Sequence, residues 1–150
     1  MPEPLVRPPT PADREALLAL MDAYIVDFYR VPRPPRERLE ALVDLLAEGK
    51  EGAQLVAEDD AGALIGFATL YFSWSTLRAA PIAILNDLYL SAAARGTGAA
   101  TALFREARAL SRERGCAGMT WQTAADNHRA QAFYTKMGGK RGDWVSYSIE

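Results

Sequence analysis

The sequence carries almost no sulfur or imidazole for metal or redox chemistry. Its 150 residues include one cysteine, Cys116, and one histidine, His128. A single cysteine excludes an internal disulfide and a cysteine-based metal cluster, and a single histidine excludes a histidine-rich metal site. We therefore expect no metal cofactor. The lack of disulfides also favours a reducing environment, so the sequence predicts a cytoplasmic protein.

Excess charge and long apolar runs are also missing. The formal net charge is −2, so the composition gives no reason to expect a basic face for nucleic acid. No apolar run is long enough to span a membrane, and the N-terminal stretch MPEPLVRPPTPADRE lacks the apolar region of a signal peptide. We expect neither nucleic-acid nor membrane partners. The length fits a single domain over residues 1–150.

The apolar pattern that is present predicts an α/β protein. Apolar residues recur at helical spacing in four segments, residues 13–28, 35–48, 99–114 and 127–139. Alternating or continuous apolar stretches predict six strands, residues 5–10, 53–59, 63–74, 81–90, 117–123 and 143–150. The predicted order is β-α-α-β-β-β-α-β-α-β. This order favours a mixed antiparallel and parallel sheet flanked by about four helices.

Residues 94–101, ARGTGAAT, join a predicted strand to a predicted helix. A nucleoside-triphosphate P-loop needs Lys-Ser/Thr after its second glycine, where this chain has two alanines. A dinucleotide-binding turn needs a third glycine or alanine where this chain has Thr101. The remaining pattern runs from Arg95 through Gly98 to Ala100, and its small side chains leave backbone N–H groups uncovered at a helix N-terminus. Such a turn binds pyrophosphate, unless the two glycines serve only to form a tight turn.

A second segment, ADNHRAQAFYTKMGGK, follows at residues 125–140. With the glycine turn, at this separation, it resembles the signature segments of the GNAT superfamily of acyl-CoA-dependent N-acetyltransferases. The similarity runs from about Leu55 to the end of the chain. It implies a GNAT-type fold, acetyl-CoA as cosubstrate, and direct transfer of the acetyl group to an amine in a ternary complex. A homodimer is common in this family.

The resemblance also assigns roles to residues. The glycine turn would hold the pyrophosphate, the preceding strand would pair its backbone with the pantetheine arm, and Asn127 and Tyr134 would contact the arm and its sulfur. The expected cofactor-binding residues are Leu88, Tyr89, Leu90, Arg95, Gly96, Thr97, Gly98, Ala99, Ala100, Asn127 and Tyr134.

Two residues are catalytic candidates for proton transfer. The resemblance places Tyr134 where the family has its general acid, although this side chain could instead simply pack on its helix face. Asp87 lies in the apolar strand ILNDLYL, where a carboxylate is costly unless it is paired. It is the candidate base, and the alternative is a capped or solvent-facing aspartate at a strand bulge. By alternation, Asp87 shares a face with Leu85 and Tyr89, while Asn86 faces the other side.

The segment YFSWSTLRAAPIAILNDLYL resembles the diamine and polyamine acetyltransferase branch of the family. That branch has aromatic residues followed by an acidic pair, and here the pair is Asn86-Asp87, with one charge missing. We expect Tyr71, Trp74, Asn86 and Asp87 to bind the acceptor, a small primary amine. Short diamines or amino-acid amines should be better acceptors than long polyamines. The alternatives are a module that senses acetyl-CoA without transfer and an acetyltransferase of protein or peptide N-termini.

Overall fold

The computed structural model describes residues 3–150 and contains one mixed sheet. Its strands follow the order of the chain: β1 (Leu5–Arg7), β2 (Gly52–Glu58), β3 (Leu64–Ser75), β4 (Ala80–Leu90) and β5 (Met119–Thr120). Neighbouring strands are antiparallel except β4 and β5, which run parallel. The predicted α/β class and the predicted order of elements are confirmed up to the last strand.

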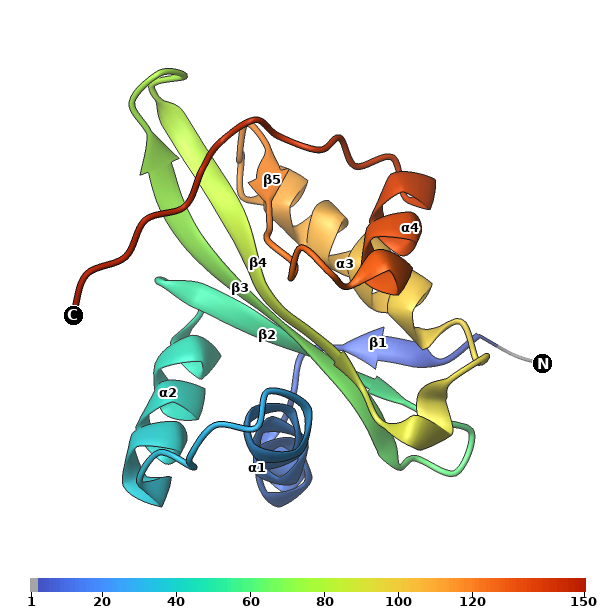
Figure 1. The fold of residues 1–150 in the computed structure, drawn as a ribbon. Coiled ribbons are helices and arrows are strands. Elements are labelled where there is room, and N and C mark those ends of the chain that lie inside the picture. The colour runs from blue at the N-terminus through green and yellow to red at the C-terminus, as the bar shows by residue number, and fades with distance from the viewer. Residues whose placement is uncertain (1–2) are drawn as a thin grey trace.

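Helices cover both faces of this sheet (Figure 1). They are α1 (Arg14–Asp22), α2 (Arg36–Glu48), α3 (Ala99–Glu113) and α4 (His128–Lys136). The pair α1 and α2 lies on one face, and α3 and α4 lie on the other. The chain leaves α1 through a π-helical turn, Ala23–Phe28, in which the ring of Tyr24 lies 5.5 Å from that of Tyr89 on β4.

The two faces have separate hydrophobic cores. One core, here the α3 core, lies between the sheet and α3 and consists of Leu55, Ala57, Ile65, Ala68, Leu70, Ala83, Leu85, Ala94, Ala99, Leu103, Phe104 and Ala107. The other, the α1 core, lies under α1 and α2 and consists of Leu17, Leu18, Leu20, Met21, Leu39, Val43, Val56 and Phe67. Because strand side chains alternate between faces, the central strands β2 and β3 contribute to both cores.

A cluster of partly buried ion pairs joins the first strand of the chain to the rest of the sheet. Arg7 of β1 contacts Asp13 at 2.6 Å and Glu58 of β2 at 2.9 Å. Asp13 also accepts a hydrogen bond from the backbone N–H of Thr10, at the start of the short helical turn that leads into α1. The guanidinium of Arg7 holds the pKa of the Asp13 carboxyl well below its ordinary value. The cluster therefore ties β1, β2 and the beginning of α1 together.

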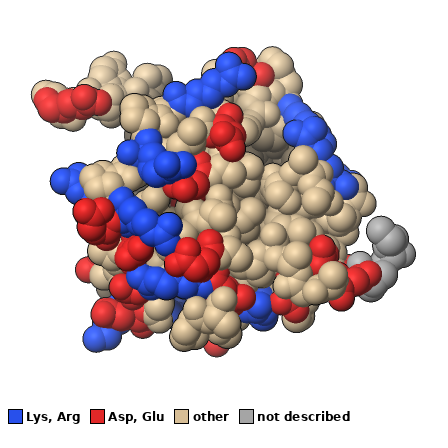
Figure 2. Space-filling view, turned by 90° about the horizontal axis from the view of Figure 1, so that it is seen from below, with Lys and Arg blue, Asp and Glu red and all other residues tan. Residues whose placement is uncertain are grey.

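The surface over α1 and α2 carries interleaved charges of both signs (Figure 2). Arg36 of α2 contacts Glu15 of α1 at 2.8 Å and Glu40 of its own helix at 2.7 Å. Arg14 of α1 pairs with Asp44 of α2. These pairs link the two helices across their exposed sides. No helix within residues 3–150 combines the length and the apolar character needed to cross a bilayer.

The strand predicted at residues 143–150 does not form, and that prediction is wrong. This segment is extended but has no strand partner, and Trp144 and Tyr147 are 90% and 94% exposed. The strand predicted at 117–123 is also shorter, because only Met119 and Thr120 pair with β4. Alternation predicts an apolar face, but a strand also needs a neighbour with free backbone groups in reach, which a one-dimensional pattern does not report.

Candidate active site

The turn before α3 presents free backbone donors. Gly96 and Gly98 have φ values of 75° and 85°, a left-handed conformation that glycine adopts without strain. Within residues 3–150 the N–H groups of Gly96, Gly98 and Ala100 donate to no other residue. A Cβ atom at either glycine would meet nothing within 4 Å, so the space in front of the turn is open. The turn therefore offers uncovered N–H groups at the positive end of a helix dipole.

Internal contacts hold this turn in shape. Ala94 and Ala99, on either side of it, are each only 1% exposed and anchor it in the α3 core. The hydroxyl of Thr97 donates to the carbonyl of Ala94 and accepts from the N–H of Ala99 at 3.3 Å. The side chain of Thr97 thus organises the turn from within, while the neighbouring N–H groups remain available.

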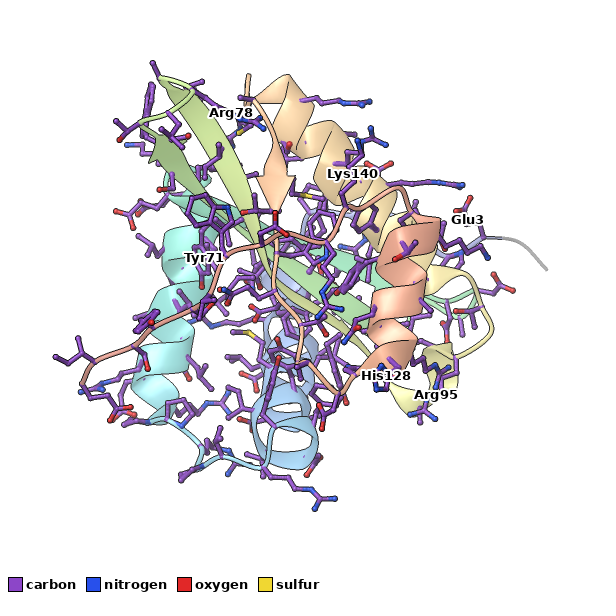
Figure 3. The ribbon with its side chains drawn as sticks, turned by 45° about the horizontal axis from the view of Figure 1, so that its top comes forward. Glu3, Tyr71, Arg78, Arg95, His128 and Lys140 are labelled. Carbon is purple, nitrogen blue, oxygen red and sulfur yellow. The ribbon has the colours of Figure 1, made fainter. Side chains whose placement is uncertain are left out.

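The helices α3 and α4 begin at the same end of the molecule. Figure 3 shows Arg95, in the turn before α3, and His128, the first residue of α4, toward the same end of that view. Asn127 caps α4, because its side-chain oxygen accepts the N–H of Ala130 at 3.1 Å. This capping bond uses the oxygen of Asn127 and leaves its amide NH₂ to donate. Two helix N-termini therefore contribute positive potential on one side of the sheet.

Between β4 and β5 the sheet opens. The two strands pair only at Ala83 with Met119 and at Ile84 with Thr120. Beyond that point, the stretch Leu88–Leu90 pairs with β3 on one side and with no strand of the described chain on the other. Its backbone is therefore free to pair with an extended ligand in the way a strand does.

A β-bulge changes which way the middle of β4 faces. Thr69 pairs with Asp87 and Leu70 with Leu85, so Asn86 is an extra residue opposite β3. Leu85 packs in the α3 core, whereas Asp87 lines a pocket on the opposite face. The predicted common face for Leu85 and Asp87 is wrong, and so are the predicted opposite faces for Asn86 and Asp87, because both line this pocket. The bulge causes both corrections, because one extra residue reverses the alternation.

The pocket next to Asp87 has a volume of about 160 Å³ and is mostly apolar. Two sequence-predicted acceptor residues, Asn86 and Asp87, lie in it together with Tyr71. Trp74 does not, because it lies three residues beyond Tyr71 on β3 and is 73% exposed. The complete lining is Met21, Tyr24, Ile25, Leu39, Leu42, Phe67, Tyr71, Asn86 and Asp87.

Asp87 carries the one carboxylate among the described residues that line this pocket. Burial raises the pKa of the Asp87 carboxyl above its ordinary value of 3.8, and the polar groups of Thr69, Tyr24 and Asn86 offset part of that rise. The amide of Asn86 donates to the Asp87 carboxylate at 3.0 Å. A carboxylate with a raised pKa is a better proton acceptor than an ordinary one, which suits the predicted role of base.

The sequence analysis did not assign Tyr24 to the site, yet Tyr24 lines this pocket, with Phe28 and Tyr29 packed beside it. Tyr24 packs edge-on against Tyr29 at 4.9 Å and near Tyr89 at 5.5 Å between ring centroids. Phe28 stacks on Tyr24 at 6.1 Å. The Tyr24 hydroxyl donates to that of Tyr29 at 3.4 Å, and burial raises the pKa of Tyr24 far above its ordinary value. The dense aromatic content of residues 24–29 was the available signal.

Tyr134 is partly buried on the other side of the opening. The centroid of its ring lies 5.3 Å from that of Trp121 and 6.3 Å from that of Phe104, which fits both a packing role and the predicted role as acid. Burial raises the pKa of the Tyr134 hydroxyl, and Tyr29 contributes to that rise. The hydroxyl therefore stays protonated at neutral pH and is available as a hydrogen-bond donor.

A second, basic hollow of about 380 Å³ lies between α3 and α4. Its lining includes Arg105, Arg108 and Lys136, with Thr101 from the first turn of α3. Three cations in one concave site suit an anionic group, and they extend the positive potential of the glycine turn along α3.

These features are typical of a group-transfer enzyme: a turn with free N–H groups at a helix N-terminus, an opening between two parallel strands, and a small pocket with one carboxylate. The chain belongs to the GNAT acetyltransferase family, because the model of the Acetyltransferase (GNAT) family matches residues 17–139. It is accordingly an acyl-CoA N-acetyltransferase by family, as the sequence predicted.

Named relatives and solved structures agree with this family. The chain is 32% identical over 133 residues to an uncharacterized N-acetyltransferase, YhfO, of Bacillus subtilis, covering 89% of this chain and 87% of that one. It is 28% identical to the D-amino-acid N-acetyltransferase HPA3 of Saccharomyces cerevisiae, covering 87% and 81%. A probable acetyltransferase of known structure superposes with a TM-score of 0.82 at 28% identity, covering 97% of each chain.

An aminoglycoside acetyltransferase, AAC(6')-Iy, shares the fold with a TM-score of 0.83 at 18% identity, covering 99% of each chain. That structure is a complex with a bisubstrate analogue, CoA-S-monomethyl-acetylneamine. These relatives do not confirm the similarity to the diamine and polyamine branch: one is named for D-amino acids, one for aminoglycosides, and the names of the other two specify no acceptor.

Proposed function

We propose that the protein transfers the acetyl group of acetyl-CoA directly to a small primary amine, with both substrates bound together. The observation that carries this proposal is the position of Asp87. It is a partly buried carboxylate in a small apolar pocket, on the strand whose backbone is open toward β5. An ammonium group that enters this pocket would pair with the Asp87 carboxylate, next to the gap between β4 and β5 where we propose that the cosubstrate binds.

The residues present fit acetyl-CoA, which supplies the acetyl group as a thioester. The free N–H groups of Gly96, Gly98 and Ala100 would bind its pyrophosphate, and Arg95 would add a positive charge. The backbone of Leu88–Leu90 would pair with the pantetheine arm. The GNAT structures solved with CoA or a CoA analogue support this choice of cosubstrate.

Asp87 would bind the acceptor and take its proton. A primary ammonium has a pKa of about 10, so the amine must lose a proton before it can attack. The carboxylate first pairs with the ammonium and then accepts that proton, for which its raised pKa prepares it. Asn86, which donates to the same carboxylate, would hold it in place.

Tyr134 would act at the sulfur. Its hydroxyl remains protonated, because burial raises its pKa, and it would donate a hydrogen bond to the departing thiolate. Complete proton transfer is less favourable than donation, since a thiol has a pKa of about 8.5 and a tyrosine about 10 even before burial. Backbone N–H groups of Leu88–Leu90 would stabilise the negative charge that develops on the carbonyl oxygen.

The pocket favours an amine that lacks a carboxylate. No lysine or arginine is among the described residues that line it, so an amino-acid carboxylate would lie near Asp87 without a counter-ion. Its volume of about 160 Å³ is below the roughly 300–1,000 Å³ of drug-sized sites, which argues against an aminoglycoside. With Asn86 in place of a second acid, short diamines should be better acceptors than spermine.

A thiol-release screen tests this proposal. It would compare short diamines, spermine, D- and L-amino acids, aminoglycosides and peptides with free N-termini, each with acetyl-CoA. A short diamine or simple alkylamine should give the highest kcat/KM. A D-amino acid as the best acceptor would contradict the argument from the missing cation, and a peptide N-terminus would contradict the small-amine proposal. Binding of acetyl-CoA without transfer to any amine would indicate a sensing module.

A further inference from the structure

A row of polar side chains crosses the sheet beside the pocket next to Asp87. Gln54 on β2 pairs in register with Thr69 on β3, and Thr69 pairs with Asp87 on β4. Val56 and Phe67, two residues away on β2 and β3, belong to the α1 core. Alternation therefore places Gln54 and Thr69 on the face of the sheet that α1 covers. The β-bulge in β4 brings Asp87 to this face as well, where it lines the pocket.

The first two members of this row are buried to a degree that polar side chains rarely reach. Gln54 is 4% exposed and Thr69 is 1% exposed. The amide of Gln54 donates to the hydroxyl oxygen of Thr69 at 3.2 Å and lies 3.7 Å from the sulfur of Met21 in α1. Burying polar groups is unfavourable compared with apolar side chains of the same shape, which would fill this space equally well. Packing alone therefore does not account for the pair.

The hydroxyl of Thr69 has one hydrogen to donate, and the row directs it toward Asp87. The Thr69 oxygen already accepts from Gln54, so its own hydrogen is free for another acceptor. The Asp87 side chain lies directly opposite, and opposite side chains in a sheet have Cβ atoms about 4.5–5.5 Å apart. A hydrogen bond from Thr69 lowers the pKa of the Asp87 carboxyl, against the rise that burial causes.

We infer that Gln54 and Thr69 are positioning residues that act through Asp87: Gln54 orients the Thr69 hydroxyl, and this hydroxyl holds the Asp87 carboxylate toward the pocket. The inference rests on the proposed role of Asp87 in binding the amine and taking its proton. Asn86 donates to the same carboxylate at 3.0 Å. A carboxylate has about four lone-pair sites, so these two donors leave room for the incoming ammonium.

Two substitutions of Thr69 separate this role from packing. Thr69→Val keeps the shape of the side chain and removes the hydroxyl, whereas Thr69→Ser keeps the hydroxyl and removes a methyl group. Thr69→Val should lower kcat/KM for the amine by roughly tenfold or more, because it removes a hydrogen bond to a charged group, and Thr69→Ser should stay within about threefold of wild type. Lost packing alone predicts the reverse order, because only serine leaves a cavity at this buried position. A Thr69→Val enzyme as active as wild type, or less impaired than Thr69→Ser, would overturn the inference.

The pH profile distinguishes an effect on Asp87 from a general loss of structure. Because the Thr69 hydroxyl stabilises the charged carboxylate, Thr69→Val should move the acid limb of kcat/KM to higher pH, and Thr69→Ser should leave it in place. Tyr24 and Tyr71 also face Asp87, but burial raises the pKa of both hydroxyls, so neither becomes charged on this limb. The described residues that α2 contributes to the lining are apolar. An acid limb that stays in place in Thr69→Val contradicts the assigned role.

Gln54→Leu tests whether the row acts in series. This substitution should lower kcat/KM less than Thr69→Val does, because the Thr69 hydroxyl still reaches Asp87 but is no longer held in one orientation. In the Thr69→Val background, Gln54→Leu should have no further effect, since both residues act through the same hydrogen bond. Independent effects of the two substitutions that multiply in the double variant would overturn the inference.

Two further measurements separate failure of this inference from failure of the proposed function. Calorimetric affinity for acetyl-CoA should be unchanged in Thr69→Val, and its loss would mean that the substitution disrupts the whole site, which would overturn the inference. A fully active Asp87→Asn enzyme would remove the proposed role of Asp87 and this inference with it. An inactive Asp87→Asn enzyme beside a Thr69→Val enzyme with wild-type kinetics would overturn only the positioning role.

Discussion

Asp87 carries its charge at a cost to the stability of the fold. Its pKa is raised above 3.8, mainly by burial. A carboxyl whose pKa is higher in the folded state destabilises that state once the pH rises above the unfolded value. Asp87→Asn should therefore raise the unfolding temperature at pH 7 while it lowers kcat/KM by about 10²–10⁴-fold, the usual contribution of a general base. Differential scanning calorimetry and the thiol-release assay measure the two effects.

The pH profile separates a base from a merely structural carboxylate. Wild-type kcat/KM should fall on the acid side as Asp87 takes up a proton, at a pH above 3.8. The deficit of Asp87→Asn should shrink as the pH approaches about 10, where a primary amine is already neutral. Asp60→Asn, in the exposed turn between β2 and β3, serves as control and should leave both quantities unchanged. An Asp87→Asn protein that is less stable and equally active would mean that the carboxylate only supports the bulge.

Tyr134→Phe should lower kcat and leave the affinity for acetyl-CoA nearly unchanged. The substitution keeps the ring packed against Phe104 and Trp121 and removes only the hydroxyl. Because burial already raises the pKa of Tyr134, we expect the lower end of the usual range for acid catalysis, about 10²-fold. Steady-state kinetics at pH 7 to 9 and calorimetric titration with acetyl-CoA provide the comparison. A decrease below about threefold would show that solvent protonates the thiolate.

The phosphate-binding role of the turn before α3 can be tested by comparison with the turn at Gly62, which has a similar backbone geometry. Gly98→Glu places a side chain and a negative charge where the pyrophosphate should bind, and acetyl-CoA binding should be lost. Gly62→Glu is the matched control, because Gly62 has a φ of 82° against 85° for Gly98 and equally open space around it. Both variants carry the same backbone strain, so only their difference reports on the site. Equal calorimetric affinities in the two variants would contradict the phosphate-binding role of the turn.

The ion cluster that ties β1 to α1 should give the fold a measurable acid sensitivity. Arg7 holds the pKa of Asp13 far below its ordinary value, so the stabilisation is complete above about pH 4 and is lost as the pH falls further. Asp13→Asn should lower the free energy of unfolding at pH 7 by about 1 kcal/mol, since the pair is partly exposed. Urea unfolding from pH 7 down to pH 3 should show the difference from wild type narrowing. A constant difference would mean that charge plays no part.

Apolar patterns in the sequence predicted helices correctly where one face of the helix packs against a hydrophobic core of the same chain. The helices at residues 13–28, 35–48, 99–114 and 127–139 all form, because their apolar residues pack on the sheet. Within β4, by contrast, alternation gave the wrong faces because the bulge at Asn86 depends on pairing with β3. Residues 143–150 do not form the predicted strand for a related reason. A strand must pair with a neighbouring strand, and the apolar pattern of one segment does not specify that neighbour.

At the scale of the molecule, acetyl-CoA should stabilise the fold. A ligand present at 100 times its dissociation constant adds about 2.7 kcal/mol to the free energy of unfolding. For a chain of this length, 1 kcal/mol corresponds to roughly 2–4 °C, so the unfolding temperature should rise by roughly 5–11 °C. Thermal-shift measurements with acetyl-CoA, and with adenine as a control that lacks the pyrophosphate and the arm, would show this. An unchanged temperature at high acetyl-CoA concentration would contradict the proposed cosubstrate.

The residues proposed for the cosubstrate were easier to select from the sequence than those proposed for the acceptor. The glycine turn before α3 and Asn127 at the start of α4 each stand out within one short stretch of the sequence. The acceptor pocket combines side chains from α1, α2, β3 and β4, which are far apart in the chain. Tyr24, within the predicted helix 13–28, had no predicted role at the site although it lines the pocket, and Trp74 was predicted to bind the acceptor but does not line the pocket.

The proposed cosubstrate turn and the proposed acceptor pocket rest mainly on different hydrophobic cores, and this separation has an evolutionary consequence. The cosubstrate turn is anchored in the α3 core, whereas most of the acceptor pocket is formed by side chains packed on the α1 core. Mutations that reshape Ile25 or Leu42 would alter the choice of amine without touching the proposed cosubstrate residues. Duplicated genes could therefore specialise on new acceptors while they inherit the same donor, and solved proteins of this fold include acetyltransferases named for aminoglycosides and for ribosomal proteins.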